Sequence, residues 1–259
     1  MSPWWREEIT AQLAPAAVTL TRRSRGFRRR ELACETLTVV SGAAAASVAH
    51  NAVATMSAYL ESNGWRNAAL RVTLHGALVR YLVLPWIEKL SDRDVLVYAQ
   101  QSFVDRYGET ARDWAVCVNA AAQGRPHIAA ATELELIETL RSGVRNLGLS
   151  LSSVQPALCS AVDDLARVDR EFSGWLALID SGHSCIARLE KGECSSVRAA
   201  RFAQSPEQHL LTQLEQDALC AGIDPAAGRL YVHAASPIDH ASLEAHGWLA
   251  SPLPAWTLR

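Results

Sequence analysis

The sequence predicts an α/β protein that consists of two lobes of similar design. Segments with strand-like alternation are interspersed with segments whose apolar residues recur every three or four positions. A strand–turn–strand unit followed by a helix occurs twice, near residues 17–63 and near 174–221, and each copy is followed by another strand. The chain has 259 residues, of which 49% are hydrophobic. That length suffices for two lobes of about 120 residues, each with its own core.

The first half of the chain contains four predicted helices separated by pairs of strands. Trp5, Ile9 and Leu13 are four residues apart and favour a short helix. Ser91 and Asp94 nearly match a capping box, and Thr132 with Glu135 completes one. In chain order we expect a helix over 3–13, strands over 17–21 and 27–39, a helix over 44–63, strands over 69–74 and 78–84, a helix ending at 108, strands over 114–118 and 128–131, and a helix ending before 148.

The second half repeats this pattern with clearer signals. Turn residues follow Asp180 and Leu189, which predicts three successive strands joined by tight turns. Ser205 precedes Pro206, an arrangement typical of a helix start, and Gly222 ends that helix. In order we expect a strand over 149–154, a helix from 156 to about 167, strands over 175–180, 185–189 and 195–202, a helix over 206–221, a strand over 229–233 and an extended tail. We place the first lobe at 1–150 and the second at 151–259.

Composition limits the classes of function. The formal net charge is −2, which argues against a dedicated nucleic-acid binder, so we expect no nucleic-acid partner. No segment has the roughly 18–20 uninterrupted apolar residues of a membrane span. The six cysteines are isolated and form no CxxC pair, which is typical of reduced thiols in a cytoplasmic protein. His233, His240 and His246 match no standard ligand spacing, so we expect no metal site.

Two tandem copies of hairpin, helix and strand suggest two ribonuclease-H-like lobes in an actin-like arrangement, the architecture of actin, sugar kinases and Hsp70. Four segments resemble the PilM- and GspL-like actin-fold proteins of type IV pilus and type II secretion assembly. They are Arg71–Trp86 (RVTLHGALVRYLVLPW), Leu96–Gly108, Leu149–Leu158 (LSLSSVQPAL) and Ala177–Ser184 (ALIDSGHS). The resemblance covers roughly residues 65–205 and is weak outside them.

The resemblance implies an actin-like scaffold at the cytoplasmic face of the inner membrane. Members of that family bind short cytoplasmic segments of membrane proteins or the assembly ATPase, and some bind ATP. We therefore expect a cytoplasmic protein held at the inner membrane by a protein partner. That partner is an inner-membrane assembly protein with a short cytoplasmic segment, and an assembly ATPase is a further candidate.

Actin-fold enzymes hold a Mg²⁺-nucleotide between two Asp-x-Gly hairpin turns. The second turn survives as a degenerate phosphate loop of five residues: Asp180, Ser181, Gly182, His183 and Ser184. The same residues also fit an ordinary β-turn. We seek the first turn in residues 18–26, which contain no acid. The sequence therefore favours a non-catalytic scaffold that is not an enzyme and needs no cofactor, with ATP binding still possible. The alternative is an actin-like ATP-binding protein or ATPase.

An arginine-rich tip is predicted between the first two strands. We expect four of its residues to bind an acidic protein partner: Arg22, Arg23, Arg25 and Arg28. A solvated hairpin tip is the simpler alternative, and a nucleic acid or an anionic lipid surface is a third. No aromatic side chains alternate with the arginines as a stacking platform for bases would require.

Overall fold

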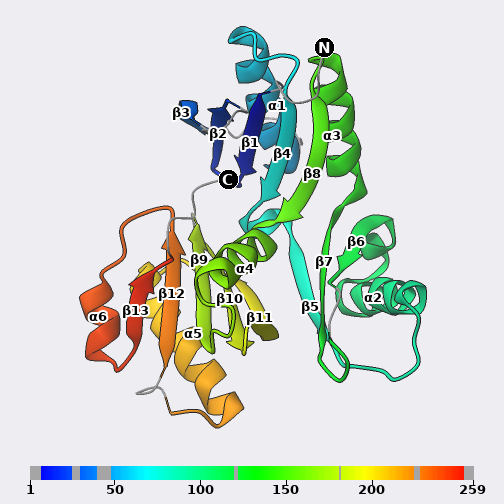
Figure 1. The fold of residues 1–259 in the computed structure, drawn as a ribbon. Helices are drawn as coiled ribbons and strands as arrows, with labels where there is room; N and C mark the ends of the chain where they lie inside the picture. The colour runs from blue at the N-terminus through cyan, green and yellow to red at the C-terminus, as the bar shows by residue number, and fades with distance from the viewer. Residues whose placement is uncertain are drawn as a thin grey trace.

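The computed structural model describes residues 7–24, 30–39, 48–119, 122–180, 182–224 and 228–253. These residues form two five-stranded sheets and a smaller three-stranded sheet. Figure 1 shows the two large sheets in separate lobes, with the small sheet beside them.

The first lobe is built on a mixed sheet of order β3-β2-β1-β4-β8. Its strands are β1 (Glu8–Leu13), β2 (Ala17–Arg23), β3 (Glu31–Thr38), β4 (Ala69–Leu74) and β8 (Ser150–Pro156). The first three are antiparallel neighbours, whereas β4 pairs in parallel with both β1 and β8. Helices α1 (Val48–Ser62) and α3 (Leu134–Asn146) pack against each other and bury one apolar face of this sheet.

The second lobe repeats the first, with sheet order β11-β10-β9-β12-β13. Its strands are β9 (Gly174–Asp180), β10 (His183–Glu190), β11 (Glu193–Arg201), β12 (Arg229–Ala234) and β13 (Leu249–Pro252). Helix α4 (Ala157–Val168) covers one face, whereas α5 (Pro206–Ala221) and α6 (His240–Ala245) cover the other. Strand β9 therefore corresponds to β1, and the β9–β10 turn corresponds to the β1–β2 turn.

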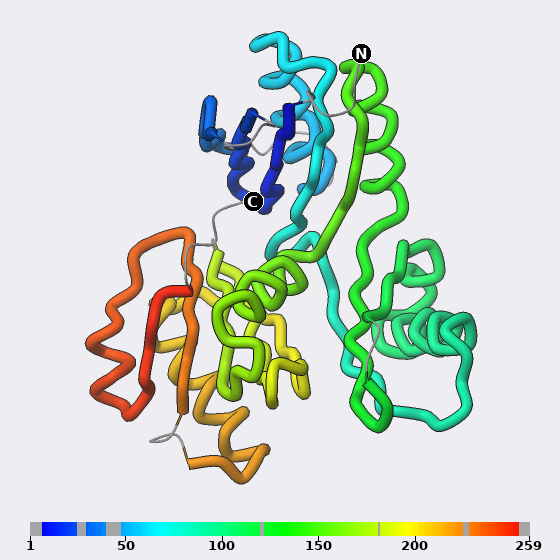
Figure 2. Tube along the Cα trace, viewed as in Figure 1, coloured from blue at the N-terminus to red at the C-terminus, as the bar shows by residue number. Residues whose placement is uncertain are grey.

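The small sheet is an insertion between β4 and β8 of the first lobe. It consists of β5 (Arg80–Leu84), β6 (Trp114–Val118) and β7 (His127–Glu133) in the antiparallel order β5-β7-β6. Helix α2 (Asp92–Tyr107) packs on it, and short 3-10 turns at Gly76–Leu78 (η2) and Glu109–Asp113 (η3) precede β5 and β6. Figure 2 shows the chain leaving the first lobe after β4 and returning through β7 and α3.

Most predicted elements are confirmed, including both strongly capped helices. The Ser91 side chain accepts from the Asp94 N–H while Asp94 accepts from the Ser91 N–H, which is the complete capping box of α2. Ser205 accepts from the Gln208 N–H at the start of α5, and Gly222 ends this helix in the left-handed conformation. Both signals act within a few residues, which is why the sequence alone predicts them.

Two predictions about individual elements are wrong, and one helix was missed. The described part of the proposed helix over 3–13 is the buried strand β1. Thr132 does not cap α3, because it lies in β7 and its hydroxyl donates to the Leu78 carbonyl 2.7 Å away. The helix α6 was not predicted. The lobe boundary between 150 and 151 stays a prediction; it lies at the start of β8, which pairs with β4.

The β10–β11 turn offers a stability test, because Gly192 has φ +79° and a methyl group there would overlap the carbonyl oxygen of Arg170. Gly148 has a similar φ of +70° but open space around it. We expect Gly148→Ala to lower the free energy of unfolding by about 1 kcal/mol through backbone strain alone. Gly192→Ala should lower it by at least about 3 kcal/mol, because the overlap adds to the strain. Urea unfolding measures both, and equal losses would contradict the close approach of Gly192 to the Arg170 carbonyl.

Candidate functional site

A cavity of about 440 Å³ lies between the two lobes, where the ends of equivalent strands meet. Its walls include Ala14 from the β1–β2 turn, Gly76 of η2, Asp180 at the end of β9 and Ser236 beyond β12. A methyl group on Gly76 would lie 3.4 Å from Pro15 and 3.5 Å from His183. The turns of both lobes therefore approach each other closely at this point, and we call this space the interlobe cavity.

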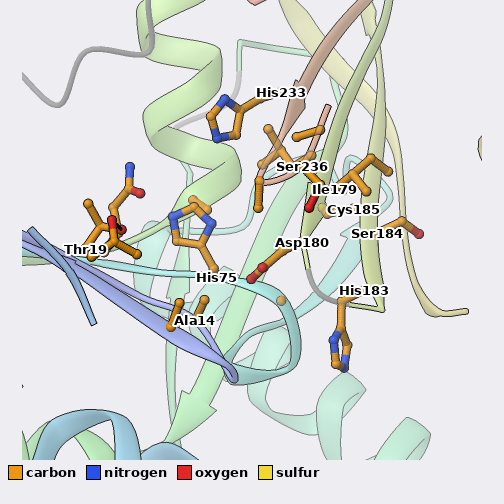
Figure 3. Close-up of a pocket in the computed structure, with 18 of the residues that line it drawn as sticks. Ala14, Thr19, His75, Ile179, Asp180, His183, Ser184, Cys185, His233 and Ser236 are labelled. Carbon is orange, nitrogen blue, oxygen red and sulfur yellow. Dashed lines mark hydrogen bonds between the residues drawn. The ribbon is translucent and has the colours of Figure 1, made fainter. Parts of the chain in front are cut away.

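Two histidines from different lobes line the interlobe cavity. His75 follows β4 and His233 lies in β12 (Figure 3). Burial and the neighbouring His233 lower the pKa of His75 to about 3, and burial lowers the pKa of His233 to about 4. Both imidazoles are therefore neutral at pH 7. Figure 3 shows the Asp180 carboxylate directed toward His75, whereas the His183 ring turns away.

Ser184 is held by a second-lobe histidine. Its hydroxyl lies 2.7 Å from Nε2 of His209, and both residues are buried. The His209 ring stacks on Phe202 with a centroid distance of 4.6 Å, and burial lowers its pKa. A serine paired with a histidine is a feature of nucleophilic hydrolases, but catalysis there also needs a third group to orient the imidazole and an oxyanion site. Among the described residues, Nδ1 of His209 lies 3.5 Å from the Gln204 amide, and no carboxylate orients this imidazole.

The electrostatics of the interlobe cavity do not suit a Mg²⁺-triphosphate. Asp180 is the one carboxylate among its described lining residues, and none of them is Lys or Arg. The first-lobe turn consists of Ala14, Pro15 and Ala16, which supply no acid, and the proline has no N–H for a phosphate oxygen. Within the described ranges, no group of three or more His, Cys, Asp or Glu could hold a metal ion. The described lining is therefore largely apolar, with neutral polar side chains and the single carboxylate of Asp180.

The counterpart of the Asp180 turn is therefore not where the sequence suggested. Residues 18–26 were expected to form it, but the matching sheet orders assign it to residues 14–16. The error follows from β1, because reading that strand as a helix shifted the first hairpin by one strand. Gly182 has φ +74° and its carbonyl accepts from the Phe202 N–H, so it closes the second turn as expected of glycine. Ser181 lies outside the described residues.

The structure describes two of the four predicted partner-binding arginines, and both form ion pairs within the chain. Arg22 forms an ion pair with Glu7 at 2.6 Å and lies 5.5 Å from the centre of the Trp65 ring. Arg23 pairs with Glu31 at 3.6 Å. Arg25 and Arg28 lie outside the described residues. Contact between these four arginines and a partner stays a prediction.

A second concave surface, missed at the level of sequence, lies between the first lobe and the inserted sheet. This groove, of about 350 Å³, is bounded by the edge strands β8 and β6, and we call it the edge groove. Val116, Ile137, Leu151 and Val154 give it an apolar lining, and the exposed Arg141 is its only charged side chain among the described lining residues. Neither strand has a described neighbour on this side, so backbone groups border the groove. No sequence motif marks it, because residues from five separate elements form it.

The described helices include no segment long and apolar enough to cross a membrane.

The interlobe histidines predict a pH dependence of stability. Their pKa values are lower in the folded protein than the usual 6.5, so the unfolded state binds more protons below that pH, and stability falls as the pH falls from 6.5 toward 4. Between pH 7.5 and 4.5, the free energy of unfolding of His75→Gln should decrease by about 2 kcal/mol less than that of the parent. Urea unfolding at both pH values measures it. His246→Gln, at an exposed histidine, is the control, and identical pH profiles for all three proteins would contradict the burial of His75.

Neither a family model nor a curated protein matches the sequence. Solved structures match its fold at low sequence identity. A structure of a PilM–PilN type IV pilus biogenesis complex matches with TM-score 0.69 and 12% identity, over 96% of this chain and 88% of the other. A protein of unknown function with an actin-like ATPase fold from Bacteroides thetaiotaomicron matches with TM-score 0.64 and 8% identity, over 95% and 90%.

The cytoplasmic domain of EpsL, an inner-membrane component of the type II secretion system of Vibrio cholerae, matches with TM-score 0.55 and 13% identity, over 98% of this chain and 88% of that domain. These similarities extend over nearly the whole chain and include both lobes. The chain therefore has a two-lobed actin-like fold similar to those of the PilM–PilN and EpsL structures.

Proposed function

We propose that this protein is a non-catalytic actin-like scaffold of a type IV pilus or type II secretion assembly platform. In this proposal it binds the cytoplasmic segment of an inner-membrane protein and is held at that membrane by this partner. The assembly ATPase is a further candidate partner, and nucleic acid is not one. The observation that carries the proposal is the chemistry of the interlobe cavity, whose first-lobe turn, Ala14-Pro15-Ala16, supplies no acid to hold a metal ion.

Phosphoryl transfer on a two-lobed fold depends on placing charge around the phosphates. A Mg²⁺ ion, cationic side chains and an acid that positions water supply most of the rate. Here Asp180 would have to hold the metal without help from the first lobe, and no lysine or arginine among the described lining residues neutralises a triphosphate. The two neutral imidazoles occupy space in the same cavity. These properties favour a scaffold over an ATPase.

The edge groove supports the binding of a peptide segment. Two strand edges border it, and an edge strand offers unpaired N–H and C=O groups to an extended peptide. On β6 these groups belong to Val116, because Asn119 N–H donates to Ile128 O and alternate residues of a strand face opposite edges. The apolar lining then selects alternate side chains of the peptide, and Arg141 at the rim favours a carboxylate.

The structural similarities are consistent with this function. One match is a complex of PilM with PilN, and another is the cytoplasmic domain of an inner-membrane component of a secretion system. The alternative is an actin-like ATP-binding protein. It is supported by Asp180 and Gly182, which retain the Asp-x-Gly pattern of the second phosphate-binding turn. The volume of the interlobe cavity also lies in the range of small-molecule sites.

We expect no ATP hydrolysis above background. Because the first-lobe turn has no acid, the phosphate released with Mg²⁺-ATP should be the same for the parent and for Asp180→Ala, and a continuous phosphate-release assay measures it. Calorimetry with Mg²⁺-ATP tests binding separately. Turnover in the parent that disappears in Asp180→Ala would refute the scaffold and establish the ATPase.

The edge groove gives a test of partner binding. Proteins captured from membrane extracts can be identified, and the cytoplasmic segment of a captured single-span protein synthesised and titrated by calorimetry. Arg141→Glu should weaken binding about two- to fivefold, because it places a like charge at the groove rim. Arg145→Glu, one turn further along α3 and also exposed, is the matched control and should bind as the parent does. Equal binding by all three proteins would exclude the edge groove as the site.

A further inference from the structure

A third concave surface lies between the inserted sheet and the second lobe, and it is strongly cationic. This cleft, of about 720 Å³, is lined by β5 and the end of α2 on one side and by β11 on the other. Its described lining residues contain four arginines and no Asp or Glu: Arg80, Arg106, Arg198 and Arg201. We call it the arginine cleft. In a chain with a formal net charge of −2, such a concentration of one sign calls for an anionic occupant.

No carboxylate in the described part of the chain forms an ion pair with any of these arginines. The Arg80 guanidinium donates to the carbonyl oxygens of Ala77 and Val79, at 2.5 and 3.3 Å, and Arg198 donates to the neutral amide of Gln216 at 3.2 Å. Arg106 and Arg201 are exposed. Within the described structure the four guanidinium charges therefore lack an ion-pair partner, and the four arginines come from three separate elements.

Two free strand edges border the arginine cleft. Strand β11 is the edge of the second-lobe sheet, and β5 is the edge of the inserted sheet; Figure 1 shows them as neighbours. Five consecutive residues of β11, from Val197 to Arg201, line the cleft. Since side chains of a strand alternate between its two faces, a lining of consecutive residues means that the cleft meets the strand at its edge.

The hydrogen bonds of each sheet identify the backbone groups at these edges. Phe202 N–H donates to Gly182 O across β10 and β11, so the N–H and C=O groups of Ala199 and Arg201 point away from β10. By the same alternation, the pairing of β7 with β6 directs the corresponding groups of Tyr81 and Val83 away from β7. The cleft thus presents both backbone partners for an extended chain and cations for its side chains.

We infer that the arginine cleft binds an acidic, extended segment of a partner protein, which pairs with the free edge of β11 and places carboxylates against Arg80, Arg106 and Arg201. The exposed side chains of Val83 and Tyr107 provide apolar contact for the intervening residues. A peptide is favoured over other anions because only a polypeptide uses the strand edges as well as the charges.

The chain itself does not supply this segment from the residues outside the described structure. Residues 1–6, 25–29, 40–47, 120–121, 181, 225–227 and 254–259 include no Asp or Glu. The acidic occupant is therefore not one of these residues. This inference uses a surface separate from the edge groove and does not depend on the proposed function.

The first experiment measures binding of a defined probe by fluorescence anisotropy. The probe is a fluorescein-labelled peptide of sequence Glu-Thr-Glu-Val-Glu-Thr-Glu, and its control has Gln in place of every Glu. We expect saturable binding of the acidic peptide only, weakening as salt is raised. Arg106→Gln and Arg201→Gln should each weaken it about two- to fivefold. Arg93→Gln, an exposed arginine of α2 outside the cleft, is the matched control and should leave it unchanged.

The second experiment separates strand pairing from charge attraction. Methylation of alternate backbone nitrogens of the probe should abolish binding in one of the two possible patterns, because only one set of N–H groups faces β11. Ala199→Pro, which removes an outward N–H of an edge strand, should act similarly. Arg141→Glu in the edge groove should have no effect, so failure here and failure of the proposed function are distinguishable.

Several results would overturn the inference. They are the absence of acidic-peptide binding, equal weakening by Arg93→Gln, and indifference to both methylation patterns. Vesicles containing phosphatidylglycerol and a 20-nucleotide oligothymidine serve as competing anions. If either binds more tightly than the peptide and loses affinity in Arg201→Gln, the cleft serves a lipid surface or a nucleic acid instead. Circular dichroism and thermal unfolding of every variant exclude loss of fold as the cause.

Discussion

Each lobe depends on one pairing, in which the first strand of a hairpin lies parallel to the strand that follows the helix. These are β1 with β4 and β9 with β12. The pairing continues one residue past the strands: His75 N–H donates to Leu13 O at 2.9 Å, and Ala235 N–H donates to Ile179 O at 3.0 Å. Because parallel strands end at the same edge, each hairpin turn lies beside the end of a parallel strand. The two lobes bring these ends together, which fixes the residues that line the interlobe cavity.

The two sheets differ on one face, and this difference sets the polarity of the cavity. In the second lobe, Leu176, Leu178 and Ala187 present an apolar face that α4 covers. The equivalent face of the first sheet carries polar side chains on three adjacent strands: Glu8, Thr10 and Gln12 on β1, Thr19 and Thr21 on β2, and Arg71 and Thr73 on β4. Gln12 and Thr19 continue this face into the interlobe cavity. The polar side chains that the first lobe places in the cavity are therefore an extension of one sheet face.

The sequence predicted the elements whose structure depends on neighbouring residues. Its predictions failed where contacts with distant residues determine the secondary structure. The capping of α2 and α5 and the turn after Asp180 follow from a few adjacent residues. Ile9 and Leu13 fit both a helical spacing of four and the alternation of a strand, and the parallel neighbour β4 decides between them. Thr132 was misjudged because its partner, Leu78, is 54 residues away. The repeat of two lobes was recognised, but the misread β1 moved the first-lobe turn to the wrong residues.

Neither the edge groove nor the arginine cleft had a sequence signal, because both arise from where the inserted sheet lies. That sheet has two free edges, β5 and β6, and each lies near the free edge of a larger sheet: β6 near β8, and β5 near β11. Unpaired strand edges are liable to pair with other chains, including further copies of the same protein. Arginines along the second pair of edges oppose self-association, since two copies of this cleft repel each other, while an acidic strand is attracted. The insertion thus creates two surfaces that differ in chemistry, one apolar and one cationic, and charge restricts which chains pair with each.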